Sequence, residues 1–417
     1  MPNKYICALD IGSSKIAAVV ARLKRNRITA IFSENALSRG IKEGTVIDSI
    51  ELIASIGGLL KKLKAKSGIN IRTVFSNISS HDMVARHSHA IIPLAERGNK
   101  VITLSDLNRV NQQARILGSS LEEEIIYQIP FSYKIDTKSD ILNPLGLYSH
   151  KLEVDLYLIC AKLSSVQTLS RVINQAGYEL KGLLLSGLTA SGIVFNPALK
   201  TGLNIFCDIG SDTTEMFVFK DGLLRDIKVC PFGGDLLTSE LSKGLQIPLD
   251  LAEDLKRAHT SIGDYERLPQ DKEILVKKGN IYKPIKQRLA CEIITAKAKF
   301  IAENLKNALR DTVSLNEVDN FICAGRTVLL EGFLEMLEAA LAVPVRLARV
   351  RHPEITAFIN ENEALTGQKY LTYLTSLGMI CQALQQEAPR VVPTHQHIRN
   401  PILKAVNKIK EVYQEYF

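Results

Sequence analysis

Hydrophobic residues are arranged in two similar groups of short runs, one near the start of the chain and one in its middle. In the first group, apolar runs at Tyr5–Ala8, Ile16–Leu23 and Ile28–Phe32 are separated by short polar turns. The second group begins at Leu203–Cys207 and repeats the order strand, turn, strand, turn as far as Ile227. Short apolar runs bounded by turn-forming residues are typical of β-strands. We therefore predict a small meander of strands from each group.

Longer stretches with apolar residues at helical spacing predict helices that cover these strands. Asp48 is a candidate N-cap for a helix that runs to about Lys66, and a second helix is expected over Ile285–Leu309. Helices are also expected over Thr327–Leu341 and Glu363–Leu384. Inward-facing residues are expected to be Leu52, Ile56, Leu59, Leu60 and Leu63 in the first helix, and Ile293, Ala296, Phe300, Ile301 and Leu305 in the second. This alternation of strands and helices predicts layered α/β domains.

Residues 80–163 have a different pattern of apolar and polar positions. We expect them to form a small α+β insertion that folds semi-independently. A helix is expected to begin at Ser105 or Asp106, with Val110, Ala114 and Leu117 on its buried side. The segment Glu124–Asp136 predicts two strands broken at Pro130, because proline cannot donate a hydrogen bond to a neighbouring strand.

The end of the chain differs again. Gln385–Arg399 is polar and contains prolines, so we expect a linker. From Asn400 onward, apolar and aromatic residues recur at helical spacing, with lysines and glutamates on the opposite side. An amphipathic helix at 400–417 fits an interfacial membrane anchor, and the alternative is a helix that docks on its own domain or on a partner. The membrane-facing residues would be Ile402, Leu403, Val406, Ile409, Val412, Tyr413, Tyr416 and Phe417.

Composition and net charge indicate which class of protein to expect. The chain has 417 residues, 46% of them hydrophobic and 23% charged, as expected for a soluble protein with more than one core. Its seven cysteines include no CxxC pair and mostly lie in apolar runs, which indicates buried thiols in a reducing compartment. We find no signal peptide and no membrane-spanning run, so a cytosolic or peripheral protein is expected. The net charge of +8 comes from scattered lysines and arginines, which disfavours nucleic acid as a partner.

The first turn of each repeated group carries the candidate chemistry. Each turn follows a strand that ends in an aspartate, Asp10 or Asp208, and then continues with isoleucine and glycine. Turn amides and small hydroxyls can surround phosphate oxygens, and a carboxylate at a strand end can hold magnesium through water. A single turn of this kind is usually only a turn, but two copies in successive halves predict a nucleotide between facing carboxylates. The candidate residues are Asp10, Gly12, Ser13, Ser14, Lys15, Asp208, Gly210, Ser211, Asp212, Thr213 and Thr214, with Asp10 and Asp208 as metal ligands.

Further motifs carry a family resemblance. The two turns, the segment Ala252–Lys256 and the corner Cys323-Ala324-Gly325 resemble the phosphate and adenosine signatures of the superfamily of actin, sugar kinases and seventy-kilodalton chaperones. Within it, the chain is similar to the bacterial cell-division family FtsA over nearly its whole length. The more specific shared motifs are Ser38-Arg39-Gly40, Gly44–Asp48, Ile129–Tyr133, Asn143–Gly146, Gly187–Ser191 and Lys228–Gly234. The resemblance adds Glu253, Lys256, Gly325 and Arg326 to the expected nucleotide site.

The resemblance implies an actin-like, ribonuclease H-like two-domain fold with an inserted subdomain called 1C. It implies ATP and Mg²⁺ as cofactors, polymerisation of the chain with itself, and a position on the cytoplasmic face of the inner membrane at the division site. There the protein would bind the C-terminal tail of FtsZ through subdomain 2B, with Lys297 as a contact, and help to recruit later division proteins. The implied division is 1–79, 164–195 and 360–384 as subdomain 1A, 80–163 as 1C, 196–231 and 300–359 as 2A, 232–299 as 2B, 385–399 as linker and 400–417 as the membrane-targeting helix.

Four residues depart from the patterns of related proteins. Arg326 follows Gly325 where a second glycine is usual, Ser211-Asp212 stand where glycines are common, and Ser186 stands where chaperone-like relatives carry a glutamate that orients the attacking water. We therefore expect ATP binding with weak or absent hydrolysis. The alternatives are a pilus-assembly actin-like ATPase, which normally lacks the terminal helix, and a sugar kinase, for which we find no convincing catalytic carboxylate.

Overall fold

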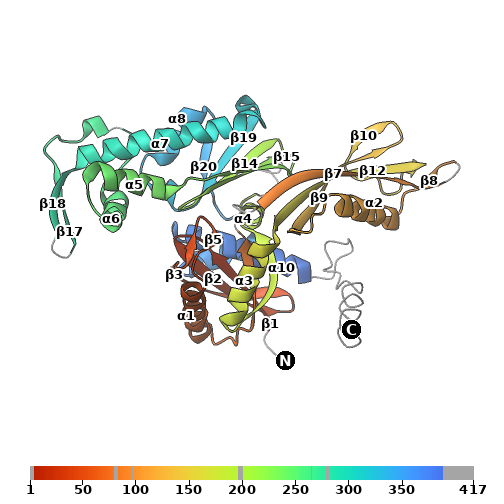
Figure 1. Ribbon diagram of the computed structural model, residues 1–417, viewed down its shortest axis with the longest axis horizontal. Coiled ribbons are helices and arrows are strands. Elements are labelled where there is room, and N and C mark those ends of the chain that lie inside the picture. Colours follow the sequence, from red (N-terminus) through yellow and green to blue (C-terminus); the bar gives the residue numbers. More distant parts are fainter. Residues whose placement is uncertain are drawn as a thin grey trace, which may run out of the picture.

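The computed structural model describes residues 4–78, 83–95, 98–195, 201–263, 265–278 and 281–387. Figure 1 shows two lobes, one in the lower centre of the view and one at the upper left, with an inserted unit that extends to the upper right. Each lobe is built around a 5-stranded sheet, and the insertion has a 4-stranded sheet of its own. The predicted α/β class with an α+β insertion is therefore confirmed.

The first lobe contains the predicted antiparallel meander. Its strands are β1 Lys4–Ile11, β2 Lys15–Lys24, β3 Arg27–Leu37, β6 Thr73–Ile78 and β13 Glu179–Leu185, in the order β13-β6-β1-β2-β3. The meander β1–β3 is antiparallel, whereas β6 pairs in parallel with both β1 and β13. A two-residue ribbon, β4 Ile41–Lys42 and β5 Thr45–Val46, follows the meander.

Helices cover both faces of this sheet, which explains why its strands read as nearly continuous apolar runs. Cys7 and Leu9 belong to the core beneath α1 Ser49–Ser67 and α3 Leu163–Gln175, while Ile6 and Ala8 belong to the core beneath α4 Ser186–Val194 and α10 Leu374–Glu387. Helix α1 begins as predicted, because the Asp48 carboxylate accepts hydrogen bonds from the Ile50 and Glu51 amides.

The second lobe repeats the first. Its strands are β14 Leu203–Ile209, β15 Thr214–Lys220, β16 Leu223–Cys230, β19 Val318–Ala324 and β20 Val345–Leu347. Their order, β16-β15-β14-β19-β20, is that of the first sheet read from the other edge. The register also agrees, since Ile11 pairs with Ile16 across one turn and Ile209 pairs with Thr214 across the other. The internal duplication predicted from the two groups of apolar runs is confirmed.

Helices α5 Gly234–Leu245, α6 Leu249–His259, α7 Gln287–Arg310 and α8 Phe333–Leu341 form the outer part of the second lobe, together with the ribbon of β17 Glu273–Lys278 and β18 Ile281–Lys286. The predicted buried face of α7 is partly wrong. Ala296 and Phe300 are exposed, because α7 is rotated so that Ile294, Ala298 and Ala302 face the core. Packing against α5 and α8, rather than the most apolar stripe, decides that orientation.

Two further helix predictions need correction. The helix expected over Thr327–Leu341 is a 3₁₀ turn, Thr327–Leu329, followed by α8, because Gly332 has φ +79° and lies against the Ile262 carbonyl. The helix expected from Glu363 starts as a 3₁₀ segment, Lys369–Tyr373, and becomes α-helical only at Leu374. Helix α9 Pro353–Glu361 has no counterpart among the predicted helices.

The insertion has the sheet order β10-β9-β12-β7 with helix α2 packed against it. Its elements are β7 Met83–Pro93, β8 Lys100–Val101, α2 Leu104–Leu117, β9 Glu123–Ile135, β10 Lys138–Ile141, β11 Tyr148–Ser149 and β12 Lys151–Lys162. The predicted break at Pro130 is wrong, since β9 continues through it with a bulge where its register against β12 shifts. Strand β10 pairs with Tyr133 and Ile135 only, so the missing amide of Pro130 leaves no gap in that ladder.

The start and the end of α2 also differ from expectation. Thr103 is the N-cap and forms a capping box with Asp106. Val110 and Ala114 are buried as predicted, but Leu117 is 63% exposed. The helix ends at Gly118, where a Cβ would meet Leu158 and Ser88 within 3 Å, so glycine occupies the place beside the sheet and Leu117 is turned outward.

All seven cysteines are buried and free, as their apolar surroundings predicted. No helix in the described part of the chain has the length and apolarity needed to cross a bilayer. The predicted linker and amphipathic helix lie outside the described residues, except that α10 extends to Glu387.

Helix α4 connects the lobes through glycines. A Cβ on Gly187 would lie 1.9 Å from the ring of Phe217, a fully buried residue of β15 in the other lobe. A Cβ on Gly378 of α10 would lie 2.2 Å from the Thr189 carbonyl of α4. By contrast, a Cβ on Gly192 of α4 would meet nothing within 4 Å.

We predict opposite effects for two substitutions on this helix. Gly187→Ala should lower the free energy of unfolding by about 1–3 kcal/mol, because Phe217 is overpacked. Gly192→Ala should leave it unchanged or raise it by up to about 1 kcal/mol, because alanine favours the helix. Urea unfolding followed by circular dichroism measures both, and equal effects of the two changes would contradict the proposed contact.

Candidate functional site

A cleft of about 1110 Å³ lies between the two lobes. It is lined by the β1–β2 turn, the β14–β15 turn, α5, α6 and the corner after β19. All but one of the predicted nucleotide residues line it: Asp10, Gly12, Ser13, Ser14, Lys15, Asp208, Gly210, Ser211, Asp212, Thr213, Glu253, Lys256, Gly325 and Arg326. The exception is Thr214, which does not line the cleft. Its side chain is buried behind the turn and donates to the Phe232 carbonyl over 2.8 Å.

The two turns have the same construction. Gly12 donates its amide to the Lys15 carbonyl over 3.0 Å, and Gly210 donates to the Thr213 carbonyl over the same distance. A Cβ on Gly12 or Gly210 would lie 3.2 Å or 3.0 Å from the carbonyl that the glycine binds, so a larger residue would strain each turn. Such tight turns leave backbone amides available at the end of a strand, an arrangement that suits anions.

Asp10 and Asp208 lie at the ends of equivalent central strands and act on one another. Enclosure by protein raises the pKa of Asp208 to about 6, and the Asp10 carboxylate adds to this rise while Lys15 opposes it. Enclosure also raises the pKa of Asp10 above its usual value, again against the effect of Lys15. The pKa of Lys15 itself falls to about 8, because enclosure outweighs the attraction of Asp10. Its ammonium donates to the Thr372 carbonyl.

This pair of carboxylates would suit a magnesium ion that is bound together with phosphate groups. The described residues contain no group of three or more histidine, cysteine, aspartate or glutamate side chains that would hold a metal unaided. Mg²⁺ bound with phosphates needs only one or two protein carboxylates, since water and phosphate supply the other ligands. A divalent cation would also offset the mutual destabilisation of Asp10 and Asp208.

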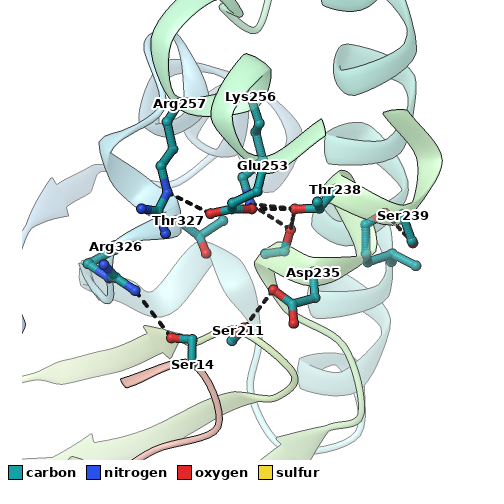
Figure 2. A network of polar contacts seen from close by, with 12 residues as sticks. Ser14, Ser211, Asp235, Thr238, Ser239, Glu253, Lys256, Arg257, Arg326 and Thr327 are labelled. Atoms are coloured by element: carbon teal, nitrogen blue, oxygen red, sulfur yellow. Dashed lines mark hydrogen bonds and ion pairs between the residues drawn. The ribbon is translucent and has the colours of Figure 1, made fainter. Parts of the chain in front are cut away.

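Helix α6 provides a wall of paired charges (Figure 2). Glu253 Oε2 accepts from Lys256 Nζ over 2.5 Å and from Thr238 Oγ1 over 2.6 Å, while its Oε1 accepts from Arg257 Nε over 2.6 Å. Burial alone would raise the pKa of Glu253, but Lys256, Thr238 and Arg257 together lower it. Burial lowers the pKa of the Lys256 ammonium, which also donates to Thr238 Oγ1 over 2.7 Å. Glu253 and Lys256 therefore neutralise one another within the wall.

The corner after β19 lies directly against the second turn. Gly325 has φ +90°, and a Cβ there would lie 2.2 Å from the Ile209 carbonyl, so glycine is required. Thr327 donates from Oγ1 to the Gly210 carbonyl over 3.1 Å. Arg326, between them, points across the cleft and donates to Ser14 Oγ over 3.2 Å (Figure 2).

Several residues that line the cleft are not among the sequence candidates, and Asn77 and Asp235 are two examples. Asn77 at the end of β6 accepts the Ile11 amide over 2.7 Å and donates to the Ile11 carbonyl over 3.3 Å, which holds the end of β1. Asp235 at the start of α5 accepts from Ser211 Oγ over 2.6 Å. Asn77 follows an apolar run and Asp235 lies at a helix start, but neither signal alone identifies a site.

Comparison with known proteins agrees with this architecture. The family model "Cell division protein FtsA" matches residues 205–374, and the model "SHS2 domain inserted in FTSA" matches residues 81–160. The cell division protein FtsA of Bacillus subtilis (strain 168) is 25% identical over 380 residues, which cover 88% of this chain and 86% of that protein.

Solved structures establish an actin-like fold. The PilM–PilN type IV pilus biogenesis complex matches with a TM-score of 0.64 at 16% identity, covering 92% of this chain and 99% of that one. MreB5 of Spiroplasma citri bound to ADP matches with a TM-score of 0.54 at 11% identity, covering 92% of this chain and 98% of that one. At these identities the likeness concerns the fold alone.

The raised pKa of Asp208 predicts a pH-dependent stability. The unfolded carboxyl ionises near pH 4 and the folded one at about pH 6, so the contribution of Asp208 to stability falls between these values and stays unfavourable above them. Asp208→Asn should therefore raise the free energy of unfolding at pH 7.5 by about 1–2 kcal/mol, less than the full pKa shift because the cleft is open to water. Urea unfolding at pH 7.5 and pH 4 should show the gain at the higher pH only. Asp254→Asn, at an exposed position, is the control, and an equal gain at both pH values would contradict the assignment.

Proposed function

The chain belongs to the FtsA family of cell-division proteins, and on this premise we propose that it is an actin-like scaffold that binds ATP, polymerises and anchors FtsZ filaments at the cytoplasmic membrane. The observation that carries the nucleotide part is the pair of equivalent Asp-Ile-Gly turns that face one cleft from opposite lobes. In MreB5, which shares the fold, the solved structure contains ADP. We propose ATP with Mg²⁺ as the ligand of this cleft.

Each part of the cleft has a proposed task. The backbone amides of the two turns would hold the phosphates, with Ser13 and Ser211 beside them. Asp10 and Asp208 would hold Mg²⁺, which neutralises phosphate charge when it is bound. The wall formed by Glu253 and Lys256 would lie along the nucleoside, and Gly325 lets the backbone approach it closely.

We propose that hydrolysis is slow or absent. Ser186 lines the cleft at the start of α4 and accepts a hydrogen bond from Asn77 Nδ2 over 3.2 Å. Neither a serine hydroxyl nor an asparagine amide takes up a proton from water near neutral pH. The position that carries a carboxylate in chaperone-like relatives thus provides no general base. Bound nucleotide would then act on assembly rather than be turned over rapidly.

We propose that FtsZ binds on the outer side of the second lobe, in subdomain 2B at about 232–299. Lys297 of α7 has a 24% exposed side chain, with its ammonium 3.4 Å from Glu240 Oε1 and 4.7 Å from the centroid of the Phe300 ring. Phe300 is 46% exposed. A lysine beside an exposed aromatic ring suits a peptide with acidic and apolar side chains.

The remaining subdomains receive proposed roles by the same family reasoning. We propose that subdomain 1A consists of residues 1–79, 164–195 and 360–384, and subdomain 2A of residues 196–231 and 300–359. Both subdomains would contact neighbouring copies of the chain in a filament. The insertion, 1C at 80–163, would receive later division proteins. The segment 400–417 would lie on the inner membrane behind the linker 385–399, at the division site.

The family match favours this assignment over the two alternatives. The PilM complex shares the fold at 16% identity, which leaves its pilus function without support here. For a sugar kinase, we still find no convincing catalytic carboxylate among the described residues. A test of whether residues 400–417 bind membranes distinguishes the scaffold from both alternatives.

Nucleotide binding is the first expected outcome. Calorimetry should show binding of MgATP and MgADP, and Asp10→Ala or Asp208→Ala should weaken it at least about tenfold, because one carboxylate of the magnesium site is lost. Phosphate release from MgATP by the purified wild type should stay close to background. Rapid turnover that either substitution abolishes would contradict the proposed slow hydrolysis, and failure of the wild type to bind MgATP and MgADP would contradict the nucleotide site.

Membrane tethering of FtsZ is the second expected outcome. In sedimentation with phosphatidylglycerol-containing vesicles, the full chain should pellet and carry FtsZ with it, whereas a chain ending at Arg399 should stay in solution. The double change Lys297→Glu with Phe300→Ala should still pellet but carry less FtsZ. Lys299→Glu, at an exposed position of the same helix, is the control. If the shortened chain pelleted with vesicles as the full chain does, residues 400–417 would not be the membrane anchor.

A further inference from the structure

Within the part of the chain that the structure describes, two hydrogen bonds cross the cleft, and they involve equivalent residues of the two turns. Arg326 of the second lobe donates from Nη2 to Ser14 Oγ of the first lobe over 3.2 Å (Figure 2). The amide of Glu43, between β4 and β5 of the first lobe, donates to Asp212 Oδ2 of the second lobe over 2.8 Å. Ser14 and Asp212 are each the third residue of their turn. The protein's own groups thus join the lobes at both turns.

The backbone of Arg326 is held rigidly on the second lobe. Gly325 before it packs on the Ile209 carbonyl, and Thr327 after it is bonded to the Gly210 carbonyl. Only the side chain is therefore free to change partners. Its guanidinium reaches the first turn, where the backbone is shaped to receive an anion.

The charge of Arg326 is less compensated than that of the other cations in the cleft. Lys256 and Arg257 both pair with Glu253, and Lys15 lies beside Asp10. Among the described residues, Arg326 has no carboxylate within ion-pair distance, and its hydrogen-bond partner is a neutral hydroxyl. Enclosure and the neighbouring Arg257 lower the pKa of Arg326, and the more distant carboxylates of Glu253 and Asp235 oppose this fall without forming an ion pair with it. A guanidinium remains charged at neutral pH. A phosphate would be a stronger partner than Ser14, because charge-assisted hydrogen bonds are roughly twice as strong as neutral ones.

We propose that Arg326 is a phosphate-recognising residue, which exchanges its bond to Ser14 for a phosphate oxygen and so selects nucleoside di- and triphosphates over nucleosides. This inference rests on the proposed function of the cleft as a nucleotide site. Where relatives commonly carry glycine at this corner, this chain adds a cation from the second lobe to a phosphate held by the first. A bound phosphate would then connect the two lobes through the Arg326 side chain. Without phosphate, the same side chain connects them through its bond to Ser14.

Calorimetry with MgATP, MgADP and adenosine tests the proposal on the full chain. Arg326→Gln should weaken binding of MgATP and MgADP about 10- to 100-fold and leave adenosine unchanged. Arg326→Lys should lose less, since the charge remains while the planar donor pair is lost. Arg349→Gln, at an exposed arginine of the same lobe outside the cleft, should bind all three ligands as the wild type does.

Hydrogen–deuterium exchange provides a readout that needs no nucleotide. Without added ligand, Arg326→Gln should exchange faster than wild type at residues 12–15 and 41–46, because one of the two cross-cleft bonds is missing. Equal affinity of wild type and Arg326→Gln for MgADP would overturn the proposal. An equal loss for adenosine would also overturn it, since the substitution would then disturb the cleft as a whole. If the wild type binds none of the three ligands, the nucleotide function itself fails and the inference fails with it.

Discussion

The constraint on which the structure depends is the placement of two carboxylates, Asp10 and Asp208, at one cleft. Each ends a strand that is paired on both sides, β1 between β6 and β2, and β14 between β19 and β15. The apolar faces of these strands are packed in the lobe cores, so neither carboxylate can withdraw without loss of a core. The fold thereby encloses both carboxylates, which raises the pKa of each, and the charge of Asp10 raises the pKa of Asp208 further. A cation bound there would relieve a destabilisation that the fold itself maintains.

The same architecture ties the cleft to the rest of the molecule. Helix α4 follows β13 of the first lobe directly and packs through Gly187 on Phe217 of the second. The insertion is fastened to the second lobe as well, because Tyr157 of β12 donates to the Asp226 carboxylate of β16 over 3.5 Å. Thr312, after α7 of the second lobe, donates to the same carboxylate over 2.9 Å and holds it in place. Arg225 adds a cation–π contact, 4.2 Å above the Phe131 ring. Rotation of one lobe against the other would disturb these contacts, so what binds in the cleft can affect the surfaces that we propose for assembly.

Interactions between residues close in the sequence explain which features could be predicted correctly. The duplicated meanders and the Asp48 cap follow from apolar runs and turn residues that act over a few positions, and fourteen of the fifteen predicted nucleotide positions line the cleft. The errors come from tertiary contacts. Phe300 and Leu117 are exposed because neighbouring elements set the rotation and end of their helices, and Pro130 is tolerated because β10 does not pair beside it. The bond between Ser14 and Arg326 joins residues 312 positions apart, and no local pattern contains it.

We propose that both lobes hold one nucleotide through equivalent turns. A crystal structure of the protein with ADP and Mg²⁺ tests it most directly. Phosphate oxygens should lie within hydrogen-bond distance of backbone amides in both Gly12–Lys15 and Gly210–Thr213, with the metal on the side of Asp10 and Asp208. A nucleotide held by one lobe alone, or bound outside the cleft, would contradict it.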